Sequence, residues 1–304
     1  MREHARARAL GDVPRAWARL ASVVGACALA GLGWLRWVDW RVDNVLQQRY
    51  DIPLTGIAVP TDSASLTEGE RQAWFHGCHG CHAAQLQGKV FIDEPGEIRL
   101  VAPNIPETIA RYSDAELSRL IRHGIRRDGT GVMGMPSADF YQMSDLDVGR
   151  IIAHLRAAPV VPHALPSTSL HLPAKLALLD GDMLPDAATI DHRAPRVGDR
   201  RDTTRAWRGE YLARTICNEC HGDRLEGIED APPLRQANGY SHPEFTALLR
   251  EGRARDGRDL PLMGRTARAR FFRFTEDEIA DIYGYLMLLR AAPSPEGDAP
   301  PPSR

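Results

Sequence analysis

The sequence lacks two features that would assign it to common functional classes. It has no excess of basic side chains, because 38 Lys and Arg residues face 40 Asp and Glu residues and leave a net charge of −2. Nucleic-acid binding needs a concentrated basic surface, so that function is disfavoured. The chain also has only five cysteines in 304 residues, too few for a fold held together by disulfides.

Segments that alternate between apolar and polar residues with period 2, as strands do, are also scarce. Apolar residues recur instead at helical spacing, as in Leu117, Leu120 and Ile121. We therefore predict an all-α chain with two domains, which the length also favours. The 26 glycines and 22 prolines make up about 16% of the residues, above an average of roughly 12%. This excess favours short helices joined by many turns.

The N-terminal residues 1–45 have the pattern of a membrane anchor. Five arginines within residues 1–19 precede sixteen uncharged residues, 20–35, and Trp34, Trp37 and Trp40 follow at helical spacing. Basic residues before an apolar span favour a cytoplasmic N-terminus, and tryptophans favour the headgroup layer. We predict a transmembrane signal anchor in the inner (cytoplasmic) membrane, with the remaining chain on the periplasmic side.

Two alternatives to an uncleaved anchor stay open. The small residues of Ala26-Cys27-Ala28 and Ala28-Leu29-Ala30 would suit cleavage of a signal peptide. The residues up to Cys27 also resemble a lipoprotein signal, in which that cysteine would be acylated. The apolar run continues beyond Cys27, which favours the anchor over both alternatives.

The other four cysteines form two Cys-x-x-Cys pairs, each followed at once by a histidine. The first motif consists of Cys78, Cys81 and His82, and the second of Cys217, Cys220 and His221. Two thiols about one helical turn apart can add to the two vinyl groups of a haem, and the adjacent histidine can then ligate the iron. The pattern is that of a c-type haem attachment site. A thioredoxin-like redox pair would need a βαβ setting, and a zinc site would need four ligands together.

The chain around these motifs is repeated. The second motif follows the first after 139 residues, and matches further downstream are separated by 128 residues. Ser113 with Glu116 and Ser241 with Glu244 lie in such matches, and each pair predicts a helix that begins with a capping box. The changing offset indicates that loops differ in length while the helices keep their order.

The repeat divides the chain into two modules. We predict domains over residues 61–158 and 205–292, which we call the first and second modules. A proline-rich linker, 159–204, would join them and carry one short helix near 172–180. Residues 293–304 have a composition typical of disorder.

The repeat also selects a second axial ligand for each iron. Met135 and Met263 each come six residues after an Asp-Gly pair that both modules share. Met133 and Met143 have no methionine counterpart in the second module. We predict iron ligation by His82 and Met135 in one module and by the equivalent pair in the other. The alternative for any single methionine is that it fills a gap in the core.

The pattern resembles class I cytochromes c, twice over, across about 61–158 and 205–292. The first module is similar to membrane-anchored dihaem and trihaem cytochromes, including the cytochrome subunits of periplasmic alcohol, aldehyde and sugar-acid dehydrogenases. The resemblance rests on the tract His123-Gly124-x3-Asp128-Gly129-x5-Met135-Pro136-x3-Phe140-x3-Ser144-Asp145. The second module departs from it, because no proline follows Met263 and three extra residues precede Thr275. A trihaem protein would carry a third motif, and this sequence has two.

The resemblance implies roles for further residues. The backbone carbonyl of Pro103 would accept a hydrogen bond from the first proximal histidine, and that of Pro232 from the second; the alternative for each is an ordinary loop proline. Independently of the resemblance, Arg127 and Arg255 match each other across the repeat and could pair with haem propionates or remain solvated charges. The histidines that flank the first site, His76 and His79, are expected to be exposed rather than to act as ligands.

These features together predict a membrane-anchored electron carrier with two covalently bound haem c groups and no catalytic residue of its own. It would pass electrons from a periplasmic dehydrogenase or a quinol-oxidising complex to a downstream cytochrome or oxidase. Two alternatives remain: a dihaem peroxidase-like enzyme, in which one iron has an open position, and a fixed haem subunit of a larger dehydrogenase or oxidase.

Overall fold

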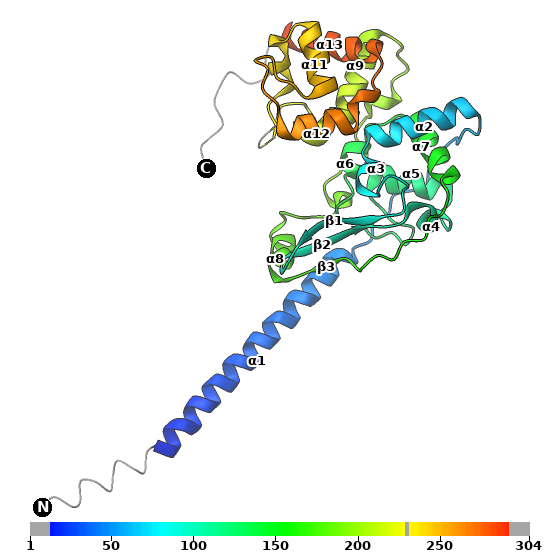
Figure 1. The fold of residues 1–304 in the computed structure, drawn as a ribbon. Coiled ribbons are helices and arrows are strands. Elements are labelled where there is room, and N and C mark those ends of the chain that lie inside the picture. The colour runs from blue at the N-terminus through cyan, green and yellow to red at the C-terminus, as the bar shows by residue number, and fades with distance from the viewer. Residues whose placement is uncertain (1–12, 229–230, 292–304) are drawn as a thin grey trace, which may run out of the picture.

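The computed structural model describes residues 13–228 and 231–291 and is mostly helical (Figure 1). The predicted disordered tail and the first part of the basic segment lie outside the described residues. Helix α1 (Val13–Leu46) projects away from the rest of the chain as one long rod. Its segment Trp17–Leu46 is long and apolar enough to cross a membrane, by length and composition alone.

The C-terminal end of α1 is docked onto the globular part of the chain. Val38 and Val42 are buried against Leu178 of helix α8 (Leu172–Asp180). Lys175 of the same helix forms an ion pair with Asp39 at 2.6 Å. The C-terminal end of α1 is therefore held against α8 by apolar packing and by an ion pair.

The first module is built from short helices around a single core. The helices are α2 (Ser63–Phe75), α3 (Cys78–Cys81), α4 (Ile105–Ile109), α5 (Asp114–His123), α6 (Ser137–Phe140) and α7 (Asp145–Ala157). Helix α2 crosses α7 at close range. A Cβ on Gly69 would lie 2.0 Å from the carbonyl oxygen of Arg150, so this crossing requires glycine.

The second module repeats this arrangement. Its elements are α9 (Arg205–Leu212), the π-helical turn η3 (Ala213–Cys217), α10 (Asn218–His221), η4 (Leu234–Gly239), α11 (His242–Glu251), α12 (Pro261–Ala269), η5 (Phe271–Arg273) and α13 (Glu276–Ala291). Helix α9 crosses α13, and a Cβ on Gly209 would lie 2.0 Å from the carbonyl oxygen of Asp281. The two modules therefore share the same glycine-dependent crossing of their first and last helices.

The predicted capping boxes are confirmed. In α5 the backbone N–H of Ser113 donates to Glu116 at 2.7 Å, and the N–H of Glu116 donates back to the serine hydroxyl at 3.2 Å. In α11 the N–H of Ser241 donates to Glu244 at 2.7 Å. These contacts satisfy backbone N–H groups that the first turn of a helix leaves without a partner. Because they need a serine and a glutamate three residues apart, both helix starts could be predicted from the sequence.

The all-α prediction is wrong in one region. The first module carries a three-stranded antiparallel sheet in the order β1 (Lys89–Glu94), β2 (Ile98–Ala102), β3 (Ser169–Leu170). In β2 the residues Ile98, Leu100 and Ala102 are buried and alternate with less buried ones. This period-2 pattern covers only five residues, which is too short to predict a strand from the sequence.

The segment predicted as a linker, 159–204, is folded onto the first module. It supplies β3, the expected short helix as α8, and the turns η1 (Asp186–Ala188) and η2 (Val197–Asp199). The hydroxyl of Tyr141 donates to the carbonyl of Ala194 at 2.8 Å, and the N–H of Gly198 donates to the carbonyl of Gln142 at 3.0 Å. Backbone and side chain thus hold the connection against the module that precedes it.

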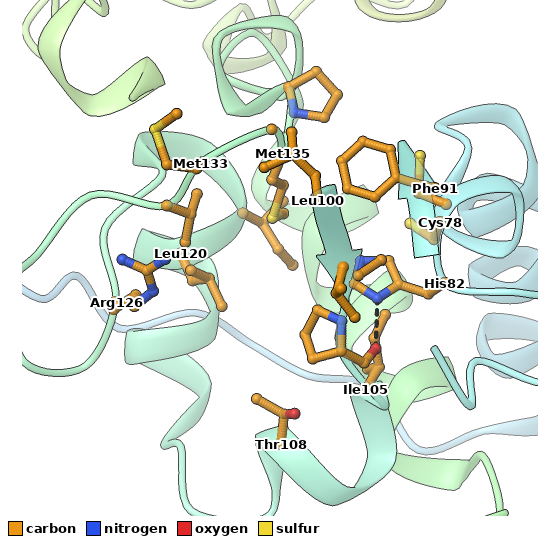
Figure 2. Close-up of a pocket in the computed structure, with 18 of the residues that line it drawn as sticks. Cys78, His82, Phe91, Leu100, Ile105, Thr108, Leu120, Arg126, Met133 and Met135 are labelled. Carbon is orange, nitrogen blue, oxygen red and sulfur yellow. Dashed lines mark hydrogen bonds between the residues drawn. The ribbon is translucent and has the colours of Figure 1, made fainter. Parts of the chain in front are cut away.

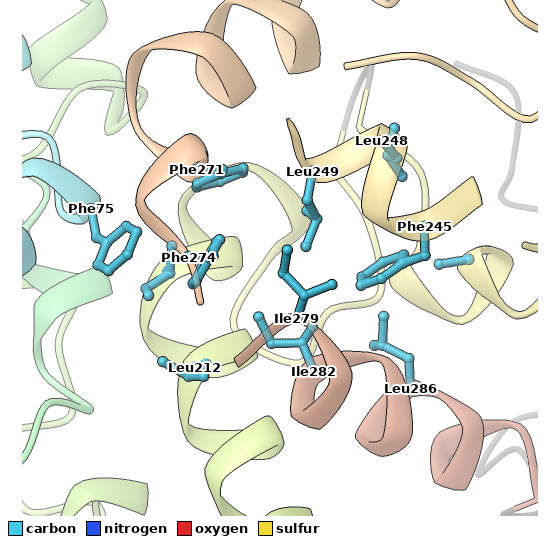
Figure 3. Packing of buried hydrophobic residues seen from close by; sticks show 12 residues of the cluster. Phe75, Leu212, Phe245, Leu248, Leu249, Phe271, Phe274, Ile279, Ile282 and Leu286 are labelled. Atoms are coloured by element: carbon cyan, nitrogen blue, oxygen red, sulfur yellow. The ribbon is translucent and has the colours of Figure 1, made fainter. Parts of the chain in front are cut away.

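The two modules share part of one core. Phe75, at the end of α2, belongs to the hydrophobic cluster of the second module (Figure 3). Arg71, one turn earlier, makes two hydrogen bonds of 2.8 Å to the carboxylate of Glu278 on α13. Arg273 lies over the ring of Trp74 at 4.2 Å. Apolar, ionic and cation–π contacts therefore join the modules along α2.

Candidate haem-binding sites

The first Cys-x-x-Cys-His motif forms a single helical turn with its histidine at the end. Gly77, in a left-handed conformation with φ 72°, begins the turn, and α3 holds both thiols. The ring Nδ1 of His82 lies 2.8 Å from the carbonyl oxygen of Pro103 (dashed in Figure 2). A carbonyl can only accept, so Nδ1 carries the proton and Nε2 keeps its lone pair, the form of an imidazole that ligates a metal. Burial lowers the pKa of His82, while the hydrogen bond to Pro103 opposes that shift.

A cavity of about 690 Å³ adjoins this turn. Cys78, Cys81, His82 and Pro103 line one part of it. The remaining lining is largely apolar and includes Phe91, Leu100, Ile105, Leu117, Leu120, Ile121, Phe140, Ile151 and Leu155. The volume lies within the range of cofactor pockets, and an apolar wall suits a flat aromatic macrocycle. The residues present therefore fit a haem attached through the two thiols.

Burial also determines the state of the thiols. It raises the pKa of Cys78 to about 12, with the charge of Cys81 as the next cause. In the second motif burial raises the pKa of Cys217 to about 12 as well. Neither thiol has the lowered pKa that is typical of a reactive redox cysteine.

Three methionines of the first module line the cavity, and their surroundings differ. Met135 packs against the core of the first module, and Met133 packs against the cluster formed by α1 and α8. Met143 is itself a fully buried core residue. Figure 2 shows Met133 and Met135 with His82 around the same cavity. Met135, the ligand that the sequence predicts, thus shares the cavity with the proximal histidine.

The second motif has the same local geometry. The ring Nδ1 of His221 lies 2.6 Å from the carbonyl oxygen of Pro232, so this histidine is also oriented by a proline carbonyl. Burial lowers the pKa of His221, and this hydrogen bond opposes the shift. In both modules the hydrogen bond joins the histidine to a proline further along the chain, as the resemblance implies.

Met263 has a different setting from Met135. It lies in helix α12, whereas Met135 lies in the irregular segment before α6. The end of α11 approaches this helix closely, because a Cβ on Gly252 would lie 2.0 Å from the Cα of Gly264. Met263 is partly buried against the core of its own module. The two methionines therefore differ in local structure as well as in sequence, because Pro136 follows Met135 in an irregular segment whereas Gly264 follows Met263 within a helix.

The expectation that His76 and His79 are exposed is wrong. Their exposed fractions are 5% and 7%. The ring of His76 meets Phe140 edge-on, and burial lowers its pKa to about 3. The ring of His79 stacks on Trp74 with 4.4 Å between centroids. Phe140 of α6 covers His76, and His154 of α7 contacts His79, so residues remote in sequence bury both rings, which the local pattern could not reveal.

The two candidate propionate arginines do not line the cavity of the first module. Arg127 is 3.3 Å from Glu116, and Arg255 donates to the carbonyl of Gly239 at 2.6 Å. Their neighbour Arg126 does line the cavity, as do Glu219 and Arg270 of the second module. Sequence analysis missed Glu219 and Arg270, because a motif search within one module cannot find side chains that the other module contributes. It also missed Arg126, which belongs to the first module.

Comparison with known proteins places the second module in a family. Residues 206–290 match the family model described as cytochrome c. These residues form a cytochrome c domain. Such a domain implies a covalently bound haem c and a role in electron transfer, in agreement with the motif that ends at His221.

Longer relatives resemble a larger part of the chain. The cytochrome c subunit of alcohol dehydrogenase (quinone) from Gluconobacter oxydans is 27% identical over 233 residues, which cover 73% of this chain and 47% of that protein. A subunit of nicotinate dehydrogenase from Pseudomonas putida is 29% identical over 213 residues, 64% of this chain and 18% of that protein. The fructose dehydrogenase cytochrome subunit from Gluconobacter japonicus is 28% identical over 171 residues, 53% and 35% respectively. The chain therefore spans less than half the length of each of these three relatives.

Proposed function

We propose that the chain is a membrane-anchored dihaem cytochrome c that relays electrons and is not itself a catalytic enzyme. Each module would hold one haem c, bound covalently by Cys78 and Cys81 in the first and by the equivalent pair in the second. The observation that carries the proposal is the shared geometry of the two motifs. In each, the histidine that follows the second thiol donates Nδ1–H to a proline carbonyl, at 2.8 and 2.6 Å.

Each residue around the first cavity would have a distinct task. His82 would bind the iron through Nε2, with its ring held by Pro103, and Met135 would supply the sulfur ligand. The apolar walls keep water away and lower the local dielectric. The haem iron would supply a one-electron couple, which His/Met ligation sets at a high potential. In the second module His221, Pro232 and Met263 would have the same tasks.

The family match covers only the second module. The proposal of a haem in the first module therefore rests on other observations. The relative from Gluconobacter oxydans aligns over 233 residues, far more than the second module contains, so that similarity extends into the first. Both modules also share the crossing at Gly69 and Gly209 and a helix with a capping box, α5 in the first module and α11 in the second. On this basis we propose cytochrome c domains at 61–158 and 205–292.

The partner is proposed from the relatives. All three named relatives are subunits of dehydrogenases. A periplasmic dehydrogenase is accordingly the electron donor that we favour, with a downstream cytochrome or oxidase as acceptor. Helix α1 would anchor the chain in the inner membrane, with both haem modules on the periplasmic side.

The haem count tests this proposal directly. A pyridine haemochrome assay on the purified chain should give two haem c per polypeptide, and replacing Cys78 and Cys81 by serine should leave one. A single haem in the unaltered chain would refute the dihaem assignment. Reduced protein should not bind CO promptly, because two axial ligands leave no open position; prompt binding at one haem would favour a peroxidase-like enzyme.

A second measurement addresses the setting of the carrier. Extraction from the native membrane in mild detergent, followed by size analysis, separates a free carrier from a stoichiometric subunit. Co-migration with a dehydrogenase at a fixed ratio would identify a subunit. Migration at the mass of the chain alone would identify a mobile carrier.

A further inference from the structure

Arg270 lies between the two haem-attachment motifs. It follows directly after α12 in the second module, and its Nη1 is 2.5 Å from the carboxylate of Glu219. Glu219 is itself part of the second motif, between Cys217 and Cys220. The side chains are partly buried, with exposed fractions of 21% and 32%. The ion pair therefore lies beside the second attachment turn rather than free in solvent.

The same guanidinium also touches the first motif. A Cβ on Gly77 would lie 2.6 Å from Nη2 of Arg270 and 2.8 Å from its Cζ, so the cation rests on the backbone just before Cys78. Arg270 and Glu219 both line the cavity of the first module. A charge pair contributed by the second module is thus part of the wall of the first.

The positions of the two side chains connect both motifs. Glu219 lies within the second motif, and Arg270 extends from its carboxylate to Gly77, the residue before the first motif. A cation and an anion therefore lie beside the same two attachment turns.

We propose that Arg270 and Glu219 set the reduction potential of the first haem from the second module. The inference rests on the proposed function, since it requires a haem in the first cavity. Reduction removes one positive charge from the iron, so a nearby cation favours the reduced form and a nearby anion the oxidised form. The pair would make the potential of one haem depend on how the other module is docked.

Two neutral substitutions test the proposal, because they predict shifts of opposite sign. In a spectroelectrochemical titration, Arg270→Gln should lower the midpoint potential of the first haem and Glu219→Gln should raise that of the same haem. The double variant should return towards the unaltered value, and Arg270→Lys should stay close to it. The first haem is identified as the component that Met135→His displaces.

Arg250→Gln is the matched control. Arg250 forms an ion pair with Glu276 at 2.7 Å in the same module, its exposed fraction of 25% is similar, and neither residue lines the first cavity. Its loss should leave both potentials unchanged. If Arg270→Gln does not fold, the shift in Glu219→Gln alone tests the proposal. This variant should fold, because the first motif has Gly80 at the position equivalent to Glu219 and so needs no acidic residue there.

Shifts of the same sign in both variants, or no shift beyond the control, would overturn the proposal while the haem content stays at two. A haem content below two in the unaltered chain would instead refute the proposed function. The two failures are therefore distinguishable in the same samples.

Discussion

The ring of Phe75, from the first module, stacks on that of Phe274, from the second, with 4.6 Å between centroids. Phe75 is fully buried. In sequence it belongs to the first module, but its side chain lies in the hydrophobic core of the second. The repeat alone describes two separate domains. This contact makes them parts of one packed unit, because a side chain of the first module lies in the core of the second.

Phe75→Ala should destabilise the chain by about 3–5 kcal/mol, because it removes a fully buried aromatic side chain and leaves a cavity. Denaturant unfolding followed by far-UV circular dichroism measures the loss, and it should remain a single transition for both modules. Phe272→Ala is the control, since that ring is 50% exposed and its loss should cost less than about 0.5 kcal/mol. Unfolding of one module alone in Phe75→Ala would show that the modules are not coupled.

Met135→Ala should abolish the sulfur-to-iron charge-transfer band of one haem, and Met263→Ala that of the other. The reason is that each thioether is the proposed sixth ligand of its own iron. Near-infrared or long-wavelength visible spectra of the oxidised protein provide the measurement. Met133→Ala is the matched control, because Met133 lines the same cavity as Met135 and should leave both bands intact. Survival of both bands in Met135→Ala would reject that residue as a ligand.

Asp139 should make the chain less stable as the pH rises from about 4 to about 7. Burial raises its pKa to about 7, aided by the nearby charges of Glu219, Asp186 and Asp223 and opposed by Arg270. The folded chain then holds a proton that the unfolded chain has lost over this range, so unfolding becomes easier with rising pH. Asp139→Asn should remove this dependence and be more stable than the unaltered chain at pH 8, but not at pH 4.

Denaturation midpoints at pH 4, 6 and 8 measure this effect. Asp128→Asn should behave in the opposite way, because hydrogen bonds from Thr130 lower the pKa of Asp128 and its charge is favourable once ionised. That variant should lose most stability at pH 6 and 8. Identical pH profiles for Asp139→Asn and the unaltered chain would contradict the assignment.

Truncation should separate the membrane role of α1 from its docking role. A chain that begins at Gly33 lacks most of the apolar span but keeps Val38, Asp39 and Val42, so it should be soluble without detergent and keep its stability. A chain that begins at Gln47 loses those contacts with α8 and should unfold at lower denaturant concentration. Equal unfolding midpoints for the two truncated chains would show that the docking adds no stability.

The sequence alone was sufficient for features that depend on neighbours in the chain. Haem attachment needs two thiols and a histidine within five residues, and a helix start needs a serine and a glutamate three residues apart. Both are short-range geometries, so the sequence predicts attachment sites at the motifs ending at His82 and His221, and its prediction of capped helix starts at Ser113 and Ser241 is confirmed. The internal repeat then extended the prediction to Met135 and Met263.

Tertiary structure alone decided the features that depend on remote segments. The three-stranded sheet joins β2 to a strand from the predicted linker, and such pairing leaves little mark on five residues. Burial of His76 and His79 results from helices that fold over them, and Arg270 reaches Gly77 only because α2 packs onto the second module. Local chemistry determined what each motif can bind. Long-range packing decided which charges surround it, because electrostatic fields act through space and not along the chain.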